Sequence, residues 1–328
     1  MKAKLILSSV AALAAASVFA AAPWEDPAVN SINRLPARTF SVPCQTEDLA
    51  LDIVQHKRPA ESSKWVLPLN GTWDFKWKSA TAVKDWEKKG KIKVPSCWQL
   101  EGEYDPPLYS NHVYPIERDA PRVTREPADK SWTSVRYRNP VGLYTTTFRR
   151  PSWRWWLRRT ILRFNGVSSA FFVRVNGKDV GYAEDSRLPS EFDLTPYLKW
   201  FGENTLEVEV YKHCDGTYLE DQDFWRLSGV ARDSYLYSRP KKCISDIRVT
   251  PDLDATYTDG SLKVNVTVPS KSTVALSLFD ADGASVASTT LTGSGDLSTV
   301  FTVPGRLVPV VLMRFKNWRI ADMSPQKP

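Results

Sequence analysis

Hydrophobic and polar positions alternate along much of the chain. Residues 69–77 and 204–210 place apolar side chains at every second position, with Leu206, Val208 and Val210 on one face. Runs of β-branched and aromatic residues lie at 160–164 and 170–175, and Asn176-Gly177 is a strong hairpin signal. Gly, Asn, Asp and Pro interrupt the pattern roughly every ten residues. The pattern predicts an all-β fold, a β-sandwich or jelly roll, with little helix.

The alternation changes register near residues 238–240. Further strands are expected at 244–249, 262–268, 274–278 and 300–302, with a hairpin turn at Asp282-Gly283. A complete immunoglobulin-like sandwich needs about seven strands, and only about five can be counted before Pro304. We therefore expect a signal peptide at 1–22, a jelly-roll sugar-binding domain at 23–240, a partial immunoglobulin-like sandwich at 241–304, and an aberrant or disordered tail at 305–328.

Two basic segments stand apart from this pattern. Residues 149–159 carry five arginines among three tryptophans and are expected to form a solvated basic loop. The segment from Gly305 onward shows no alternation, which a reading-frame error in the coding sequence would also explain. Together the two segments account for more than the whole net charge of +7. Because no basic stripe runs through the patterned strands, the charge does not indicate nucleic-acid binding.

The N-terminus has the form of a secretory signal peptide. Lys2 and Lys4 precede an apolar, Ala-rich run from Leu5 to Phe19, and small residues suitable for cleavage follow at Ala20 and Ala22. No other stretch approaches the ~20 apolar residues of a membrane-spanning helix. We expect a periplasmic or secreted mature protein with no membrane partner.

The cysteine and histidine content argues against a zinc or histidine-rich metal site. The chain has four cysteines and three histidines, and the cysteine spacings match no zinc pattern. Export permits disulfides, but a domain of this size does not require them. We expect free, mostly buried thiols at Cys44, Cys97, Cys214 and Cys243.

Several long motifs resemble glycoside hydrolase family 2 enzymes of the large bacterial β-galactosidase type. They occur in the family's order between Trp24 and Ile247. The motifs are Trp24-Glu-Asp-Pro-Ala-Val-Asn-Ser-Ile-Asn-Arg-Leu-Pro-Ala-Arg38, Leu69-Asn-Gly-Thr-Trp-Asp-Phe75, Val94-Pro-Ser-Cys-Trp-Gln99, Pro107-Leu-Tyr-Ser-Asn-His-Val-Tyr-Pro-Ile116, Gly166-Val-Ser-Ser-Ala-Phe-Phe172, Gly181-Tyr-Ala-Glu-Asp-Ser-Arg-Leu-Pro-Ser-Glu-Phe-Asp-Leu194 and Asp215-Gly-Thr-Tyr-Leu-Glu-Asp-Gln-Asp-Phe-Trp-Arg-Leu-Ser-Gly-Val-Ala-Arg-Asp233.

The resemblance implies a jelly roll, an immunoglobulin-like domain and then a (β/α)₈ barrel that carries an acid/base and a nucleophilic glutamate. Such an enzyme hydrolyses terminal non-reducing β-D-galactose residues of β-galactosides with retention, and it can be a homo-oligomer. We expect this chain to end before the barrel, to hold no catalytic residue and to be inactive alone. Two alternatives remain open: a non-catalytic carbohydrate-binding module, and a structural remnant without a ligand.

The same resemblance assigns two substrate-binding residues. Asn111 matches an asparagine that reaches the galactose hydroxyls, which an amide suits because it both donates and accepts. Asp223 matches an aspartate that contacts the sugar and ligates a sodium ion, since carboxylate oxygen is a hard donor. The alternatives are a turn residue for Asn111 and a solvated acid or an ion pair with Arg226 for Asp223.

A magnesium site is also implied by the resemblance. Its ligands would be Asp26, the Val29 carbonyl, Glu184 and Asp215. Pro23 stands where the family example has an acid, which removes one ligand, and Glu184 stands in place of a glutamine, which restores a charge. The sequence leaves an occupied and an empty site equally open. Trp98 and Trp225 are expected to pack in the core rather than stack on sugar.

Overall fold

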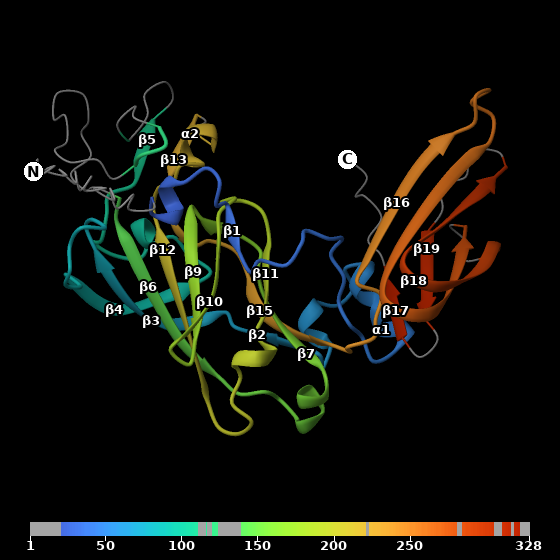
Figure 1. Ribbon diagram of the computed structural model, residues 1–328, viewed down its shortest axis with the longest axis horizontal. Coiled ribbons are helices and arrows are strands. Elements are labelled where there is room, and N and C mark those ends of the chain that lie inside the picture. Colours follow the sequence, from blue (N-terminus) through green and yellow to red (C-terminus); the bar gives the residue numbers. More distant parts are fainter. Residues whose placement is uncertain are drawn as a thin grey trace, which may run out of the picture.

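The computed structural model describes residues 21–110, 116, 120–123, 139–220, 223–280, 284–304, 310–315 and 318–321. Antiparallel strands dominate, and they form a large sandwich and a separate smaller sheet (Figure 1). The predicted all-β fold is confirmed. Within the described part of the chain, no helix has the length and apolarity needed to cross a membrane.

The sandwich consists of two facing antiparallel sheets. The larger sheet runs in the order β1 (Ser31–Ile32), β10 (Lys178–Ala183), β9 (Ala170–Val175), β12 (Asn204–Tyr211), β6 (Val141–Phe148), β3 (Gly71–Lys78) and β4 (Lys88–Val94). The smaller runs in the order β11 (Ser190–Asp193), β7 (Arg159–Phe164), β15 (Ser234–Arg239) and β2 (Val66–Pro68). The short strands β8 (Val167–Ser168) and β14 (Gly229–Val230) pair beside them.

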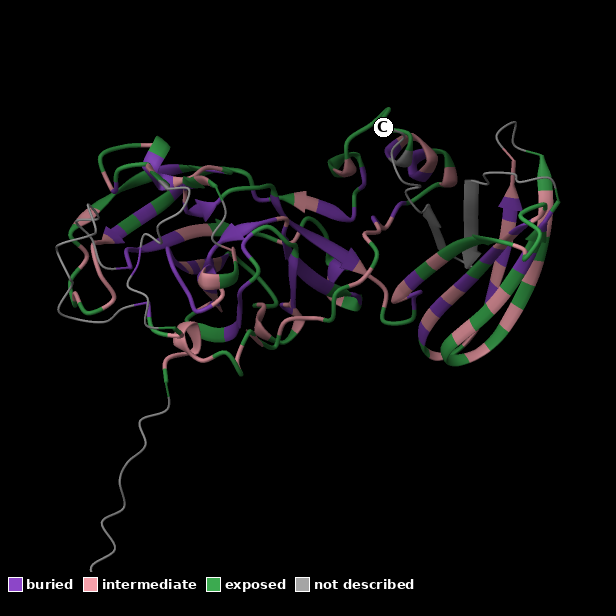
Figure 2. Cartoon of the chain, turned by 90° about the horizontal axis from the view of Figure 1, so that it is seen from above, coloured by how far each residue is buried: buried purple, intermediate pink, exposed green. Residues whose placement is uncertain are grey.

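Alternation along the strands builds the core between the sheets. In β3 the side chains of Trp73, Phe75 and Trp77 are buried while their neighbours face outward. They pack with apolar residues of β7, β9, β12 and β15 in one cluster. The buried and exposed stripes along the strands are visible in Figure 2. Burying so many large side chains, each contributing about 1.5–3 kcal/mol, is the main stabilising term of this sandwich.

The hairpin between β9 and β10 forms as the sequence predicts. Asn176 and Gly177 both adopt positive φ, at 54° and 75°, and Lys178 pairs with Val175. Two consecutive left-handed residues define the type I′ turn, whose twist matches the flanking strands. The turn fixes the register of β9 against β10 at the hairpin end.

One helix on the sandwich was not expected from the sequence. Helix α1 (Glu47–Val54) begins at Thr46, whose side-chain oxygen accepts a hydrogen bond from the Leu49 amide. It packs its apolar face against β2, β7 and β15. The other helical turns are short: η1 (Pro23–Glu25), η2 (Ala60–Ser62), η3 (Trp98–Leu100), η4 (Trp153–Leu157), η5 (Thr195–Tyr197) and α2 (Thr217–Glu220).

The prediction of a solvated basic loop at residues 149–159 is partly wrong. Its η4 turn carries Trp155 into the core, where the side chain is 1% exposed and the indole N–H donates to the Lys64 carbonyl. Arg158 is also buried, with its guanidinium carbon 3.8 Å above the Trp65 ring and two hydrogen bonds to Ser238. These partners come from distant strands, so local composition did not reveal the burial.

The second sheet begins after β15. It contains β16 (Asp246–Leu253), β17 (Gly260–Phe279), β18 (Ser285–Val303), β19 (Val310–Phe315) and β20 (Trp318–Ala321). The strands expected at 262–268 and 274–278 are one continuous strand, β17, with a register shift between Val268 and Ser272. Strands β19 and β20 fall in the segment expected to be an aberrant or disordered tail, and the apolar run Val-Val-Leu-Met-Arg-Phe at 310–315 explains the pairing of β19 with β17. The turn at Asp282-Gly283 lies outside the described residues.

Candidate functional site

A small strand pair at one end of the sandwich positions the predicted substrate residues. Strand β5 (Leu108–Ser110) pairs with β13 (Phe224–Arg226), and Ser110 lies opposite Phe224. Asp223 directly precedes β13 and so adjoins the Ser110 end of this ladder, while Asn111 is the next residue after β5 in the sequence. Asn111 itself lies outside the described residues. The ladder stands beside α2 at the upper end of the sandwich in Figure 1.

Asp223 is exposed and is held by a tyrosine. The Tyr109 hydroxyl donates to Asp223 Oδ1 at 2.5 Å, and this bond together with the carboxylate charge raises the pKa of Tyr109. Arg226, the ion-pair alternative for Asp223, places its guanidinium carbon 4.3 Å from the centre of the Phe224 ring. Asp223 is exposed, so a sugar hydroxyl or a cation could reach its carboxylate.

Trp98 and Trp225 have opposite environments. Trp98 is fully buried and packs on Phe75, which confirms the core prediction for this residue. The core prediction for Trp225 is wrong: its side chain is 55% exposed and its ring lies 5.7 Å from that of Tyr109. Strand β13 is too short and too peripheral to reach the core, and the result is an exposed aromatic pair next to Asp223.

A cavity of about 320 Å³ opens beside this ladder. Its walls come from five separate parts of the sequence, so the linear pattern gave no sign of it. Arg187 and Arg226 flank the Phe224 ring at 4.7 and 4.3 Å from its centre. The lining residues are Ser168, Ser169, Ser186, Arg187, Lys212, His213, Thr217, Leu219, Glu220, Phe224, Arg226, Leu227 and Ser228.

The floor of the cavity is a buried polar network. Lys212 Nζ forms a 2.5 Å ion pair with Asp105, and both side chains are 1% exposed. Gln99 Nε2 donates to the same carboxylate at 3.0 Å. Burial, followed by the charges of Lys212 and Arg226, holds the pKa of His213 well below its ordinary value, so the imidazole stays neutral. The Asn139 side chain bonds both the amide and the carbonyl of His213 and fixes its position.

The N-terminal arm lies over two buried acids on the same side of the fold. The Asp215 amide donates to the Trp24 carbonyl at 2.8 Å, and the Glu184 amide donates to the Asn30 carbonyl at 3.2 Å. Strand β1 then pairs with the end of β10. The arm is thus tied by its backbone to both sides of the Glu184–Asp215 pair, as the implied magnesium site requires.

The carboxyl groups of Glu184 and Asp215 are buried close together, which disfavours ionisation of both at once. The ligand atoms of Glu184, Cys214 and Asp215 lie within 4.8 Å of one another, and all three residues are buried. Burial and the nearby Asp215 carboxylate raise the pKa of Glu184 to about 8, against a lowering by the hydrogen bond from the Tyr182 hydroxyl. Two buried carboxylates this close require a shared proton or a cation between them.

The donor chemistry of this pair fits a magnesium ion. Carboxylate oxygens are its preferred ligands, and burial with the neighbouring acids raises the pKa of Cys214, so its sulfur stays a neutral thiol. The Asp26 carboxylate accepts from the Ala28 amide at 3.1 Å, and the Val29 amide bonds the Asp26 carbonyl at 2.8 Å. The described arm therefore forms a tight turn at Asp26 and Val29, next to the strand that covers Glu184.

Comparison with known proteins identifies the sandwich. The family model described as "Glycosyl hydrolases family 2, sugar binding domain" matches residues 66–240, more than half of the chain. The chain belongs to glycoside hydrolase family 2. It is 42% identical over 255 residues to a β-galactosidase of Priestia megaterium, covering 75% of this chain and 23% of that protein. A β-galactosidase of Photobacterium profundum is 42% identical over 268 residues, covering 78% and 24%.

Solved structures of family 2 enzymes share the fold. A Bifidobacterium dentium β-glucuronidase complexed with coumarin-3-O-glucuronide matches with a TM-score of 0.56 at 19% identity, over 76% of this chain and 45% of that one. A β-glucuronidase of an uncultured Clostridium matches with a TM-score of 0.54 at 20% identity, over 78% and 44%. The chain spans about a quarter of the length of the curated relatives it matches.

The structure brings two of the predicted magnesium ligands of this family 2 domain together and places the predicted substrate residue Asp223 elsewhere, on the β5–β13 ladder. Glu184 and Asp215 adjoin each other, and Asp223 stands on the exposed ladder beside the cavity. Tyr109, Arg187 and His213 were not singled out from the sequence. Tyr109 carries the one available signal, because it precedes the predicted substrate residue Asn111 by two positions in the sequence.

Proposed function

We propose that this chain is the N-terminal, sugar-binding part of an exported β-galactosidase that releases terminal non-reducing β-D-galactose from β-galactosides. The proposal is supported by 42% identity to curated β-galactosidases. The observation that carries it is the exposed Asp223 carboxylate, which Tyr109 holds on the β5–β13 ladder, one residue before Phe224 of the cavity wall.

In this proposal Asp223 and Asn111 hold the galactose. A carboxylate accepts hydrogen bonds from sugar hydroxyls, and these charge-assisted bonds are the stronger kind. The Tyr109 hydroxyl donates a hydrogen bond to one carboxylate oxygen of Asp223 and thereby helps to orient the carboxylate. A sodium ion would be held by Asp223 as its anionic ligand, and it would supply a fixed positive charge for a sugar hydroxyl oxygen. The exposed ring of Trp225 offers a surface for the apolar face of the sugar.

The two catalytic glutamates would belong to a barrel outside this chain. Retaining hydrolysis needs two carboxyl groups about 5 Å apart on either side of the glycosidic bond. Glu184 and Asp215 are close, but both lie buried beneath the arm, where a sugar cannot reach them. Glu220 accepts from the amide and hydroxyl of Ser186 and is thereby committed to holding its loop.

A magnesium ion would bind Glu184 and Asp215, with Asp26 and the Val29 carbonyl completing the set. Its contribution would be structural, since it would replace the shared proton and tie the arm to β10. The ion would also stabilise the wall of the cavity, because helix α2 begins two residues after Asp215.

The test is the substrate preference of the protein that carries this chain together with its barrel. We expect nitrophenyl β-D-galactoside to be hydrolysed with a higher kcat/KM than the matching β-D-glucuronide. Asp223→Asn should lower kcat/KM for the galactoside at least tenfold, or about 1.4 kcal/mol. Asp179→Asn, an exposed acid in the β9–β10 hairpin, is the matched control and should leave it unchanged. Preference for the glucuronide would overturn the galactose assignment.

A further inference from the structure

A group of exposed apolar side chains, aromatic except for Leu157, lies on two neighbouring loops of the sandwich. Trp153 and Leu157 belong to η4, and Trp200 and Phe201 belong to the turn before β12; their exposures are 60%, 67%, 68% and 76%. We call these four residues and Trp156 the aromatic platform. Single exposed apolar residues are ordinary, but a cluster of them marks an interaction surface.

The platform has a fixed shape. The Trp156 ring packs edge-on against Trp200 at 6.0 Å and Phe201 at 5.0 Å between centroids. Arg150 crosses between the loops: its guanidinium carbon lies 5.5 Å from the Trp156 ring centre, and its Nη2 donates to the carbonyls of Lys199 and Trp200 at 2.5 and 3.3 Å. Beneath, the buried Trp155 anchors η4. A preorganised surface loses little conformational entropy on binding.

The surroundings of the platform are basic. Four basic residues adjoin it on the two loops: Arg149, Arg150, Arg154 and Lys199. The exposed Glu203 offsets part of this charge, because it forms a 3.6 Å ion pair with Arg149. Arg154 lies 5.7 Å from the Trp153 ring centre and so alternates with the aromatic rings. Aromatic faces interleaved with cations suit a ligand that is apolar on one side and negatively charged at its edge.

The platform is remote from the cavity. It adjoins the Asn204 end of β12, whereas Lys212 and His213 of the cavity floor follow the opposite end. A strand of eight residues rises about 27 Å. Figure 1 agrees: the turn between β6 and β7 lies at the lower end of the sandwich and the β5–β13 ladder at the upper end.

We propose that the aromatic platform binds an anionic galactan, a polymer of galactose bearing sulfate or carboxylate groups. The C–H face of a galactose ring would pack on the exposed indole rings, and its anionic groups would pair with Arg154 and Lys199. The choice of a galactose polymer rests on the proposed function; the charge and aromatic arrangement are independent of it. The site would hold a long substrate at a second point, separated from the cavity floor by about the 27 Å length of β12.

The experiment measures binding of the full chain to labelled hexasaccharides by fluorescence anisotropy. The probes are a sulfated galactan, the same galactan after desulfation, and an oligogalacturonate. We expect the sulfated or the carboxylated probe to bind, with affinity falling as salt rises, and the desulfated probe to bind at least about fivefold more weakly.

Paired variants connect the binding to the platform. The double variant Trp200→Ala/Phe201→Ala should weaken binding about tenfold, and Arg154→Gln/Lys199→Gln should remove most of the salt dependence. Tyr257→Ala, which removes an exposed aromatic side chain from the second sheet, is the control for loss of aromatic surface. In the protein with its barrel, Trp200→Ala/Phe201→Ala should hydrolyse nitrophenyl β-D-galactoside as wild type does, so a failure of the galactosidase proposal and a failure of this one give different results. Unchanged thermal unfolding shows that each variant is folded.

Three results would overturn the proposal. The first is equal binding of wild-type chain and Trp200→Ala/Phe201→Ala to every probe, or no binding at all. The second is platform-dependent binding to vesicles of phosphatidylglycerol without binding to any sugar, which would make the platform a membrane contact. The third is a dimer in sedimentation that the double variant abolishes, which would make it a contact between copies.

Discussion

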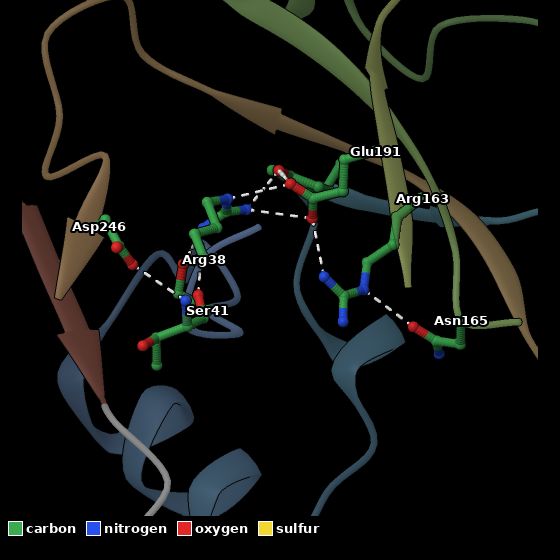
Figure 3. A network of polar contacts seen from close by, with 8 residues as sticks. Arg38, Ser41, Arg163, Asn165, Glu191 and Asp246 are labelled. Atoms are coloured by element: carbon green, nitrogen blue, oxygen red, sulfur yellow. Dashed lines mark hydrogen bonds and ion pairs between the residues drawn. The ribbon is translucent and has the colours of Figure 1, made fainter. Parts of the chain in front are cut away.

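Replacing Glu191 by glutamine should destabilise the sandwich strongly. The Glu191 carboxylate lies between two arginines from different parts of the chain, Arg38 of the N-terminal arm and Arg163 of β7 (Figure 3). Arg38 Nε and Arg163 Nη1 lie 3.0 and 2.9 Å from its oxygens, and the Tyr237 hydroxyl donates at 3.0 Å. All three charged side chains are less than 10% exposed.

The magnitude follows from the burial. Removing one partner of a buried ion pair leaves an uncompensated charge and costs about 3–5 kcal/mol. Glutamine keeps the shape and can still accept a hydrogen bond, so the lost quantity is the charge. At roughly 2–4 °C per kcal/mol for a domain of this size, the midpoint of thermal unfolding should fall by roughly 10 °C. Glu203→Gln removes an exposed pair with Arg149 and should cost less than about 1 kcal/mol.

The effect should depend on pH in a defined direction. Burial opposes ionisation of Glu191, but the charges of Arg38 and Arg163 outweigh it and hold its pKa below the ordinary value of 4.5. A lowered pKa stabilises the fold above the unfolded value, and this stabilisation is lost as pH falls through the folded value. The difference between wild type and Glu191→Gln should therefore shrink below about pH 4.5. Near-UV circular dichroism during heating measures it; a variant within 0.5 kcal/mol of wild type at pH 7 would refute the reasoning.

Three further predictions concern the ions, the sugar and export. In the protein with its barrel, Asp223→Asn should lower kcat/KM and abolish its sodium dependence, a loss of about 1.5–3 kcal/mol per interaction, whereas Asn111→Ala should lose only about 0.5–1.5 kcal/mol per neutral bond; normal sodium dependence in Asp223→Asn would show a solvated acid instead. Magnesium should stabilise the wild-type chain against unfolding by about 2.7 kcal/mol at a hundredfold excess over Kd, and the midpoint of thermal unfolding should rise accordingly. Glu184→Gln should at least halve this stabilisation; equal stabilisation of both proteins would place the ion elsewhere. N-terminal sequencing of exported protein should show cleavage after Ala20 or Ala22, and an intact Met1 would contradict it.

Alternation and turn chemistry were sufficient for most of the sandwich. Strands β3 and β12 lie where the period of two places them, because one face of each packs in the core. Strands β7 and β9 lie where the runs of β-branched and aromatic residues predict them. Helix α1 was missed because eight residues give too few turns for a helical period to emerge. The continuity of β17 was missed because Pro269 and Ser270 resemble a turn, although the strand passes through them at a register shift.

The site was less predictable than the fold. Motif resemblance brought Glu184 and Asp215 together, and the structure agrees. The cavity escaped prediction because its walls meet only through folding, from β8 to β13. Buried Arg158 and the network around Glu191 were also hidden, since a charged residue in sequence gives no sign of a buried partner that lies 80 or 153 residues away, as Ser238 does from Arg158 and Glu191 does from Arg38. Tertiary pairing, not local pattern, decided these positions.

The central claim is that this family 2 domain recognises galactose through Asp223. Saturation-transfer NMR on the chain itself, with methyl β-D-galactoside, the matching glucoside and the matching glucuronide, tests it at the millimolar affinities expected for a site with few contacts. We predict transfer to the galactoside above the other two, strengthened by sodium and lost in Asp223→Asn but not in Asp179→Asn. Equal transfer to all three sugars, or a galactoside signal that survives Asp223→Asn, would contradict the account.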